Sequence, residues 1–205
     1  MNLVRFLLID SFIVILILLI FKFNGNKFPF LLNSNDSNII DETCIKIPDL
    51  EKILELENLA KKKGSGISFD QLIGFWKFVS VWEKGTDKEA QLPSSLLRLF
   101  SASLELRERE TNKGFLQFDI LNSIEFGILS IRFKGCGEIK GPQPLLPFYF
   151  EEIQLNIGEK RLLTKTLETP DAKESPFFAL IGIGDNCEWL AARGRGGGLA
   201  VWLKA

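Results

Sequence analysis

The fold is decided by the stretch Leu72-Ile73-Gly74-Phe75-Trp76-Lys77-Phe78-Val79-Ser80-Val81-Trp82-Glu83-Lys84. Successive side chains of a β-strand point to opposite faces of its sheet. One face of this strand is therefore predicted to carry Trp76, Phe78, Ser80 and Trp82. Two indole rings and one phenyl ring on a single face need a large apolar volume, which we expect to be the interior of a β-barrel.

Short strand-like runs separated by turn signals follow this first strand almost to the last residue, with no helical pattern between them. They are 104–109, 115–121, 124–133, 148–157, 161–167, 177–183, 188–193 and 199–203. Asn122-Ser123 is predicted to be a turn, and Gly135-Cys136-Gly137 a bulge or sharp bend. With the strand from Gly74, about nine strands result, which is typical of an antiparallel barrel or sandwich.

The chain divides into three parts by composition: residues 1–23, residues 24–46 and a β-domain over 47–205. The segment 24–46 is rich in Asn and Ser and is predicted to be a flexible linker. The β-domain opens with a helix over 48–63, with Pro48 suited to the first helical position and Gly64 to its end. This helix is expected to pack on the domain or close one end of the barrel. A role in binding a partner protein is the alternative.

Residues 1–23 are strongly apolar and just long enough to span a bilayer, although Arg5 and Asp10 interrupt the first half. An uncleaved membrane anchor is the preferred interpretation. The short uncharged run would also suit a signal peptide, but the bulky residues after it do not form a cleavage site. A hairpin at the membrane surface is a further alternative.

Composition excludes several classes of function. The net charge is −1, so no overall field favours nucleic acid, and we expect no nucleic-acid partner. Histidine is absent, which removes the commonest general base and metal ligand. Three widely spaced cysteines indicate neither a disulfide framework nor a zinc site, and they favour a reducing compartment. We therefore predict no catalytic residues, no metal and no cofactor.

Two late features are expected to be structural. Gly194-Arg195-Gly196-Gly197-Gly198 lies between two strands and is predicted to be a hairpin turn with positive φ, since no helix follows it as in a phosphate loop. Contact of this turn with an anion is the alternative. Arg193 could stack across an indole such as Trp76 by cation–π attraction, or could lie on the surface.

Four stretches together resemble the plastid lipid-associated proteins, also called fibrillins. Gly74-Phe75-Trp76 is similar to the Gly-x-Trp signature of lipocalin-like barrels, and the helix before it resembles the opening of the family. The run from Gly135 to Leu146 is similar to the family's Gly-rich bend before a Pro-containing strand. Leu190 to Gly197 resembles its Arg-Gly turn, with Arg195 where the family usually has an acidic residue. The resemblance, to a divergent cyanobacterial branch, covers about residues 48–204.

The resemblance implies a lipocalin-like antiparallel β-barrel that binds a hydrophobic metabolite, such as a lipid, quinone or carotenoid, at photosynthetic membranes. The expected place is a thylakoid or inner membrane, with the barrel in a reducing aqueous compartment. The expected ligand contacts are Phe78, Ser80, Trp82, Phe118, Leu129 and Phe150, and the expected structural motif is Gly74, Trp76, Arg193 and Gly194. A bilin lyase or isomerase on the same barrel and a membrane-tethered scaffold protein remain as alternatives. The sequence leaves the oligomeric state open.

Overall fold

The computed structural model describes residues 47–82, 84, 101–110, 116–141, 144–171, 173 and 175–205. The predicted anchor over 1–23 and linker over 24–46 lie outside these residues. Among the residues described, neither helix has the length and apolar character needed to cross a bilayer. The helices are α2 (Leu50–Lys63) and α3 (Phe69–Leu72). The strands are β1 (Gly74–Trp82), β2 (Ser103–Arg109), β3 (Gln117–Phe126), β4 (Leu129–Glu138), β5 (Leu145–Ile157), β6 (Lys160–Thr166), β7 (Phe177–Ile183), β8 (Trp189–Gly194) and β9 (Leu199–Lys204).

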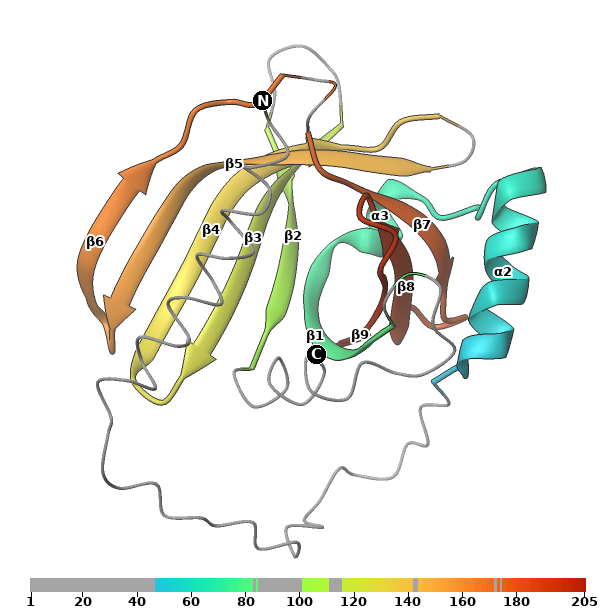
Figure 1. Ribbon diagram of the computed structural model, residues 1–205, viewed down its shortest axis with the longest axis horizontal. Helices are drawn as coiled ribbons and strands as arrows, with labels where there is room; N and C mark the ends of the chain where they lie inside the picture. Colours follow the sequence, from blue (N-terminus) through green and yellow to red (C-terminus); the bar gives the residue numbers. More distant parts are fainter. Residues whose placement is uncertain are drawn as a thin grey trace, which may run out of the picture. The chain divides into compact units, whose positions relative to one another are not determined.

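All nine strands belong to one antiparallel sheet in the order β4-β3-β2-β1-β9-β8-β7-β5-β6. An additional pairing of β4 with β5 closes the sheet into a ring and leaves β6 as an extension (Figure 1). The predicted mainly β, antiparallel class is confirmed. Closure gives eight of the strands a neighbour on both edges, which removes most of the unpaired backbone groups that an open sheet would expose.

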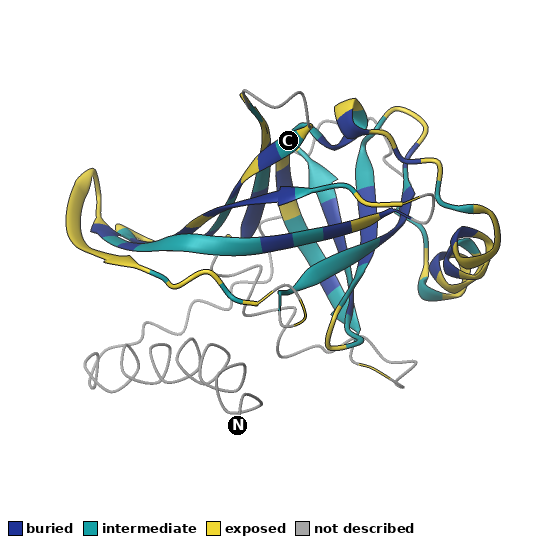
Figure 2. Ribbon diagram, turned by 90° about the horizontal axis from the view of Figure 1, so that it is seen from above, coloured by how far each residue is buried: buried dark blue, intermediate teal, exposed yellow. Residues whose placement is uncertain are grey.

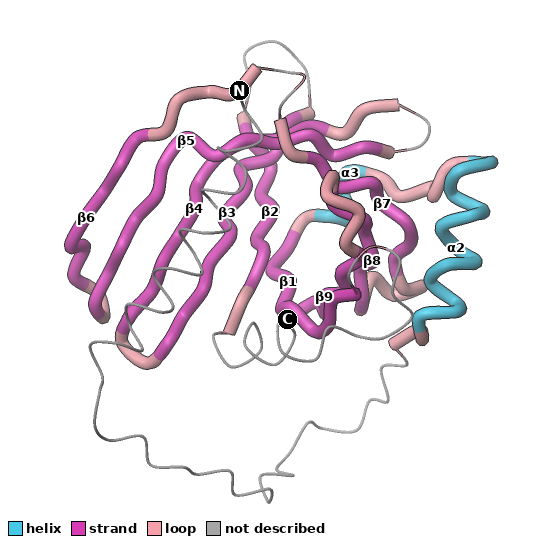
Figure 3. Tube along the Cα trace, in the orientation of Figure 1, coloured by secondary structure: helices cyan, strands magenta, loops and turns pink. Residues whose placement is uncertain are grey.

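The ring is held together at one end and diverges at the other. Strand β1 pairs with β2 only over Gly74–Lys77, and β5 pairs with β7 only over Leu145–Pro147. Past Lys77, β1 is hydrogen-bonded to β9 and no longer to β2. Past Pro147, β5 is no longer paired with β7, and its residues from Glu152 onward pair with β6. The sheet therefore consists of two parts, β2 to β6 and β7 to β9 with β1, as the tube in Figure 3 shows.

Strand β3 corrects one sequence prediction. The expected turn at Asn122-Ser123 is wrong, because both residues lie within β3 and are paired on both sides. The Ser123 hydroxyl has a cross-strand partner in Ser103, with 2.7 Å between the two Oγ atoms. The chain turns instead at Gly127, whose φ of 57° places it in the left-handed region. Polar residues with a cross-strand partner can continue a strand, which a turn propensity alone does not reveal.

Helix α2 begins at Leu50, two residues later than the predicted start at Pro48. Asp49 is its N-cap, and its side chain accepts a hydrogen bond of 2.9 Å from the backbone nitrogen of Lys52. Gly64 ends the helix with φ 84°, as the sequence predicts. The helix packs on β7, on the outside of the ring. It therefore covers the wall of the ring, as Figure 1 shows.

The buried side chains form two separate clusters, one on each face of the sheet. Figure 2 shows that buried residues occur along the strands of the ring and also along α2. The larger fills the interior of the ring around Trp76, Phe118 and Leu106. The smaller lies between α2 and the outer face of β7, β8 and β9, and contains Ile53, Ile181, Ala191, Leu199 and Val201. Strands β7, β8 and β9 contribute side chains to both clusters, because successive residues point to opposite faces of the sheet. In β8, for example, Leu190 and Ala192 face the interior while Ala191 faces the helix.

The predicted bulge or bend at Gly135-Cys136-Gly137 lies on the neighbouring strand instead: these three residues continue β4 without a break against β3, and the extra residue is Glu151 of β5. The register between β4 and β5 shifts between Lys134 and Gly135. A Cβ atom at Gly135 would collide with the carbonyl oxygen of Tyr149 and lie 2.7 Å from the Cα of Phe150. The missing side chain thus permits the close strand approach at which β4 and β5 close the ring.

Candidate functional site

A β-bulge in β1 divides the aromatic stripe between the two faces of the sheet. Phe78 is paired with Trp202, but the next registered pair is Ser80 with Val201, so Val79 is the extra residue. Phe78 packs against the interior cluster, whereas Val201 and Trp82 belong to the cluster beneath α2. The prediction that Trp76, Phe78, Ser80 and Trp82 share one inward face is therefore wrong. The bulge reverses the alternation, and it places Ser80 and Trp82 on the side that faces the helix.

The end of the interior next to α3 is filled by side chains. Trp76 and Phe118 are both fully buried. Phe118, an expected ligand contact, stacks on Phe69 of α3, with 4.1 Å between ring centroids. The indole nitrogen of Trp76 donates a hydrogen bond of 2.9 Å to the carbonyl oxygen of Leu72. Short helix α3 and the start of β1 therefore plug this end of the ring.

The cation beside Trp76 is Lys204, not Arg193. The Lys204 ammonium lies 5.1 Å from the centroid of the indole, a cation–π geometry. The same lysine passes so close to Gly74 that an added Cβ would lie 2.7 Å from its Cε. Gly74, with φ 141°, and Trp76 thus form one structural unit with the last strand. The predicted stacking of Arg193 across Trp76 is wrong, because alternation along β8 turns Arg193 to the outer face.

Arg193 instead binds Glu57 of α2. Its Nε and Nη2 donate to the two carboxylate oxygens at 2.7 and 2.6 Å, and Nη1 donates to the carbonyl oxygen of Gly197 at 2.6 Å. The hydrogen bonds from Arg193 lower the pKa of Glu57, against an opposing effect of burial, and Lys61 lowers it further. Gly194 opens the hairpin turn, and Gly197 has the expected positive φ of 92°. The motif residues Arg193 and Gly194 therefore hold the helix and the turn together.

A row of aromatic rings runs through the interior toward the divergent end. Phe150 lies 5.4 Å from Phe133 and 5.5 Å from Phe148, measured between ring centroids. Phe148 stacks on Phe178 at 4.9 Å, and Phe178 meets Trp202 edge-on at 5.5 Å. Phe148 and Trp202 are buried, whereas Phe150 and Phe178 are half-buried. The row connects the filled end with less buried parts of the interior face.

Beyond this row the interior face of β3 to β6 carries aliphatic side chains that are half-buried or exposed. Ile124, Ile131, Leu155 and Leu163 are in register across the four strands. Their neighbours on this face include Leu129, Ile153 and Ile157. Leu163 is 60% exposed and Ile157 41% exposed. We call these seven residues the apolar shelf. Leu129, an expected ligand contact, lies at its edge, and Phe150 lies in the aromatic row at its base.

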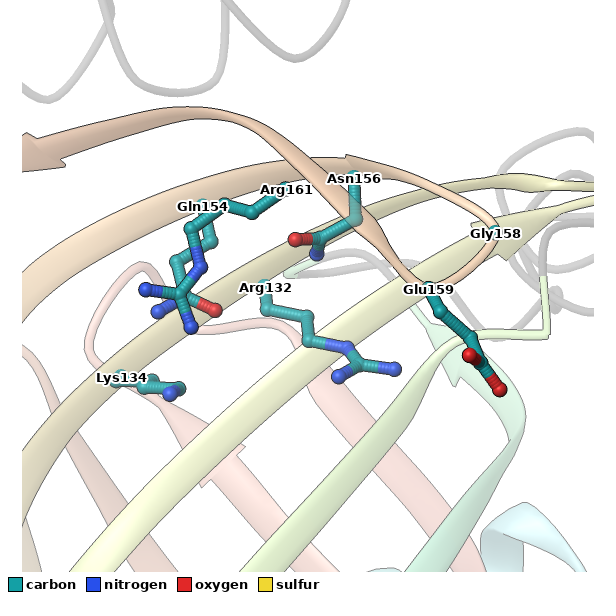
Figure 4. A pocket seen from close by; sticks show the side chains of 7 residues that line it. All are labelled: Arg132, Lys134, Gln154, Asn156, Gly158, Glu159 and Arg161. Carbon is teal, nitrogen blue, oxygen red and sulfur yellow. The ribbon is translucent and has the colours of Figure 1, made fainter.

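The opposite, outer face of the same strands carries a polar pocket. The pocket has a volume of about 530 Å³ and is lined by Arg132, Lys134, Gln154, Asn156, Gly158, Glu159 and Arg161 (Figure 4). None of these residues indicates a pocket in the sequence by itself, because charged and amide residues on a β-domain are usually just exposed to solvent. Their placement in one hollow depends on the pairing of β4, β5 and β6.

A cluster of titratable groups lies elsewhere on the outer face. Tyr149 and Cys136 are directly opposite each other, near Arg109 and Glu151. Hydrogen bonding with Cys136, and then burial, raise the pKa of Tyr149 to about 12. Burial likewise raises the pKa of the Cys136 thiol, which keeps it protonated and a poor nucleophile at neutral pH. Among the residues described, no three His, Cys, Asp or Glu side chains group as metal ligands.

Comparison with models of known protein families finds no family that matches the chain. Comparison with curated protein sequences finds no relative either.

Sequence reasoning missed two features of this region. The shelf residues Leu155 and Leu163 were within expected strands, but their common row requires the register of β5 with β6. A sign of the ion pair of Arg193 could have been found in the sequence, because its partner Glu57 lies on the same face of α2 as the buried residues Ile53 and Ala60. A carboxylate on the apolar face of a helix indicates a buried ion pair, because an unpaired buried charge is very costly.

Proposed function

We propose that this protein is a non-catalytic binding or carrier protein for an apolar small molecule, such as a lipid, quinone or carotenoid. The molecule lies on the apolar shelf, with its end against the half-buried rings of Phe150 and Phe178. The sheet acts as a lipocalin-like barrel whose end near α3 is plugged and whose divergent end receives the ligand. Residues 1–23 tether it to a photosynthetic membrane.

The observation that carries the proposal is the apolar row Ile124, Ile131, Leu155 and Leu163, which leaves aliphatic side chains half-buried or exposed on an interior face. Apolar surface of this kind favours an apolar occupant, since each 100 Å² removed from water contributes about 2.5 kcal/mol. A contiguous exposed apolar patch on a soluble domain is typical of a binding site.

The expected ligand contacts separate into three groups. Phe78, Phe150 and Leu129 lie on the interior face, where Leu129 belongs to the apolar shelf and Phe150 borders it. Phe118 lies in the filled end, where it stacks on Phe69. Ser80 and Trp82 lie on the outer face, and we assign them to the packing of α2.

The test is extraction of the purified full-length protein with organic solvent, followed by mass spectrometry of the extract. An apolar metabolite in about stoichiometric amount is the expected result. Titration of the delipidated protein with that metabolite then compares Leu163→Lys with Leu59→Lys. Leu59 is the matched control, since it is 51% exposed on α2, away from the shelf.

Leu163→Lys is expected to weaken binding by about tenfold, because a buried Leu side chain contributes roughly 1.5–3 kcal/mol. Leu59→Lys is expected to bind like the wild type. Either an extract without any apolar metabolite or equal titration curves for the two variants would contradict the proposed function.

A further inference from the structure

The polar pocket is formed by three adjacent strands on the face opposite the apolar shelf. Arg132 of β4 is directly opposite Gln154 of β5, and Asn156 of β5 is opposite Arg161 of β6. Lys134 lies two residues beyond Arg132, so strand alternation places it on the same face. Glu159 and Gly158 belong to the turn between β5 and β6. The pocket is thus fixed by backbone pairing on three strands.

The lining carries three cations and one carboxylate. Over the described part of the chain, Lys134 and Arg161 form no ion pair, and Arg132 has only a 3.5 Å contact with Glu125. Glu152 is opposite Lys134, but its carboxylate accepts a hydrogen bond from the Gln154 amide. Figure 4 shows Glu159 at the turn end, with Arg132 between it and Lys134. Two of the three cations are therefore available to an anion.

Two buried amides add acceptors to this lining. Gln154 is 3% exposed and Asn156 is 7% exposed. Each uses its NH₂ group, Gln154 toward Glu152 and Asn156 toward the Ser130 hydroxyl at 3.2 Å. Within the described residues, neither amide oxygen receives a hydrogen bond. An amide oxygen is a hydrogen-bond acceptor, so both oxygens can accept from the hydroxyl groups of a ligand.

We propose that this outer pocket binds a phosphate group on a hydroxyl-bearing molecule, either a free phosphorylated metabolite or the headgroup of a phospholipid. Guanidinium groups bind phosphate oxygens in a two-pronged geometry, and an ammonium adds a third charge. The amide oxygens accept from the hydroxyl groups of the same molecule. A long polyanion fits less well, because Glu159 lies at one end and the net charge of the chain is −1.

The first test measures thermal unfolding of the full-length protein in inorganic phosphate against chloride of equal ionic strength. A ligand that binds only the folded state raises the unfolding temperature. The variants are Lys134→Gln and Arg161→Gln, and the control is Lys165→Gln. Lys165 lies on the same strand as Arg161 and is exposed, but it is opposite Ile153 on the shelf side. Far-UV circular dichroism checks that all variants are folded.

Phosphate is expected to stabilise the wild type and the control. Its affinity for Arg161→Gln is expected to fall by about tenfold or more, as for loss of a hydrogen bond to a charged group. A second test measures flotation with vesicles of phosphatidylcholine alone or with added phosphatidic acid. The vesicles of phosphatidylcholine alone are the control, since they measure membrane binding by parts of the chain other than the polar pocket.

Stabilisation by inorganic phosphate without a preference for phosphatidic acid identifies a free phosphorylated metabolite as the ligand. A preference for phosphatidic acid that is lost in Arg161→Gln and kept in Lys165→Gln identifies the headgroup. If Lys134→Gln and Arg161→Gln match Lys165→Gln in both tests, the proposal is overturned. Binding of an apolar molecule to the shelf is measured separately and is independent of either result.

Discussion

Arg193 on β8 and Glu57 on α2, which are 136 residues apart, form a two-pronged ion pair with N–O distances of 2.7 and 2.6 Å. The Glu57 side chain is 9% exposed and the Arg193 side chain 25% exposed. The third arm of the guanidinium binds the turn carbonyl of Gly197. One side chain thus connects the helix, the eighth strand and the last hairpin, which explains why this arginine precedes a glycine-rich turn.

Replacement of Glu57 by Gln is expected to lower the free energy of unfolding by about 2 kcal/mol. Loss of one partner from a fully buried ion pair costs about 3–5 kcal/mol, and the partial exposure of Arg193 reduces that figure. Urea denaturation measures the change. The matched control is Glu55→Gln on the same helix, whose pair with Lys52 is more than half exposed and contributes at most about 0.5 kcal/mol. Equal midpoints for the two variants would show that the Glu57 pair does not stabilise the fold.

Because of this ion pair, we expect the free energy of unfolding to depend on pH in the acidic range. The pKa of Glu57 is lowered in the folded protein, mainly by hydrogen bonding from Arg193. Between the folded pKa and the ordinary value of 4.5, the unfolded chain therefore binds more protons than the folded chain. The stabilisation is complete above the ordinary value and is lost as the pH falls through the folded pKa. Urea midpoints from pH 7 to pH 3 should fall less steeply in Glu57→Gln than in Glu55→Gln.

Replacement of Gly135 by Ala is expected to destabilise the protein by more than about 3 kcal/mol or prevent folding, because the added Cβ meets backbone atoms of β5. Backbone atoms cannot move aside as a flexible side chain can. Gly196→Ala is the control, since a Cβ there has nothing within 4 Å and its φ is not in the left-handed region. Thermal unfolding separates the two. A Gly135→Ala protein as stable as Gly196→Ala would contradict the close approach of β4 and β5.

Tyr149 offers a direct spectroscopic test, because it is the only tyrosine in the chain. The ultraviolet absorbance of tyrosinate should titrate with a midpoint of about 12, rather than the ordinary value of 10. Cys136→Ala removes the hydrogen bond and should lower the midpoint. Since the folded protein holds this proton more tightly, stability is present below pH 10 and declines as the pH rises through 10 to 12. A midpoint of 10 in both proteins would contradict the pairing of Tyr149 with Cys136.

Much of the architecture could be predicted from local pattern. The Gly64 helix end and the strand over Phe177–Ile183 follow from residue-level preferences, and the structure confirms them. Predictions from local pattern were wrong where contacts with distant parts of the chain decided the conformation or the partner of a residue. Asn122 and Ser123 have turn propensity, yet pairing with β2 and β4 keeps them extended. For Arg193 the sequence predicted either stacking on an indole such as Trp76 or a surface position, and the pairing with Glu57 was missed because a sequence does not show which helix covers which strand.

The candidate site was less predictable than the fold. Phe150 and Leu129 lie by the apolar shelf, but the single extra residue Val79 moved Ser80 and Trp82 to the other face. A bulge has no strict sequence signature, and it reverses the facing of every later residue in its strand. The polar pocket was not predicted at all, since Arg132, Gln154 and Arg161 belong to three strands.

The sequence by itself determined the class and the elements of this protein. Alternation of apolar and polar residues and the punctuation by Gly, Pro and Asn are local properties, and they specify an antiparallel β-domain preceded by a helix. Only the tertiary structure decided which surfaces those elements form. The pairing of β4 with β5 closes the ring, and the pairing of β5 with β6 separates an apolar face from a basic one. The physical reason is that register depends on contacts between residues far apart in the chain, and a shift of one residue exchanges the two faces.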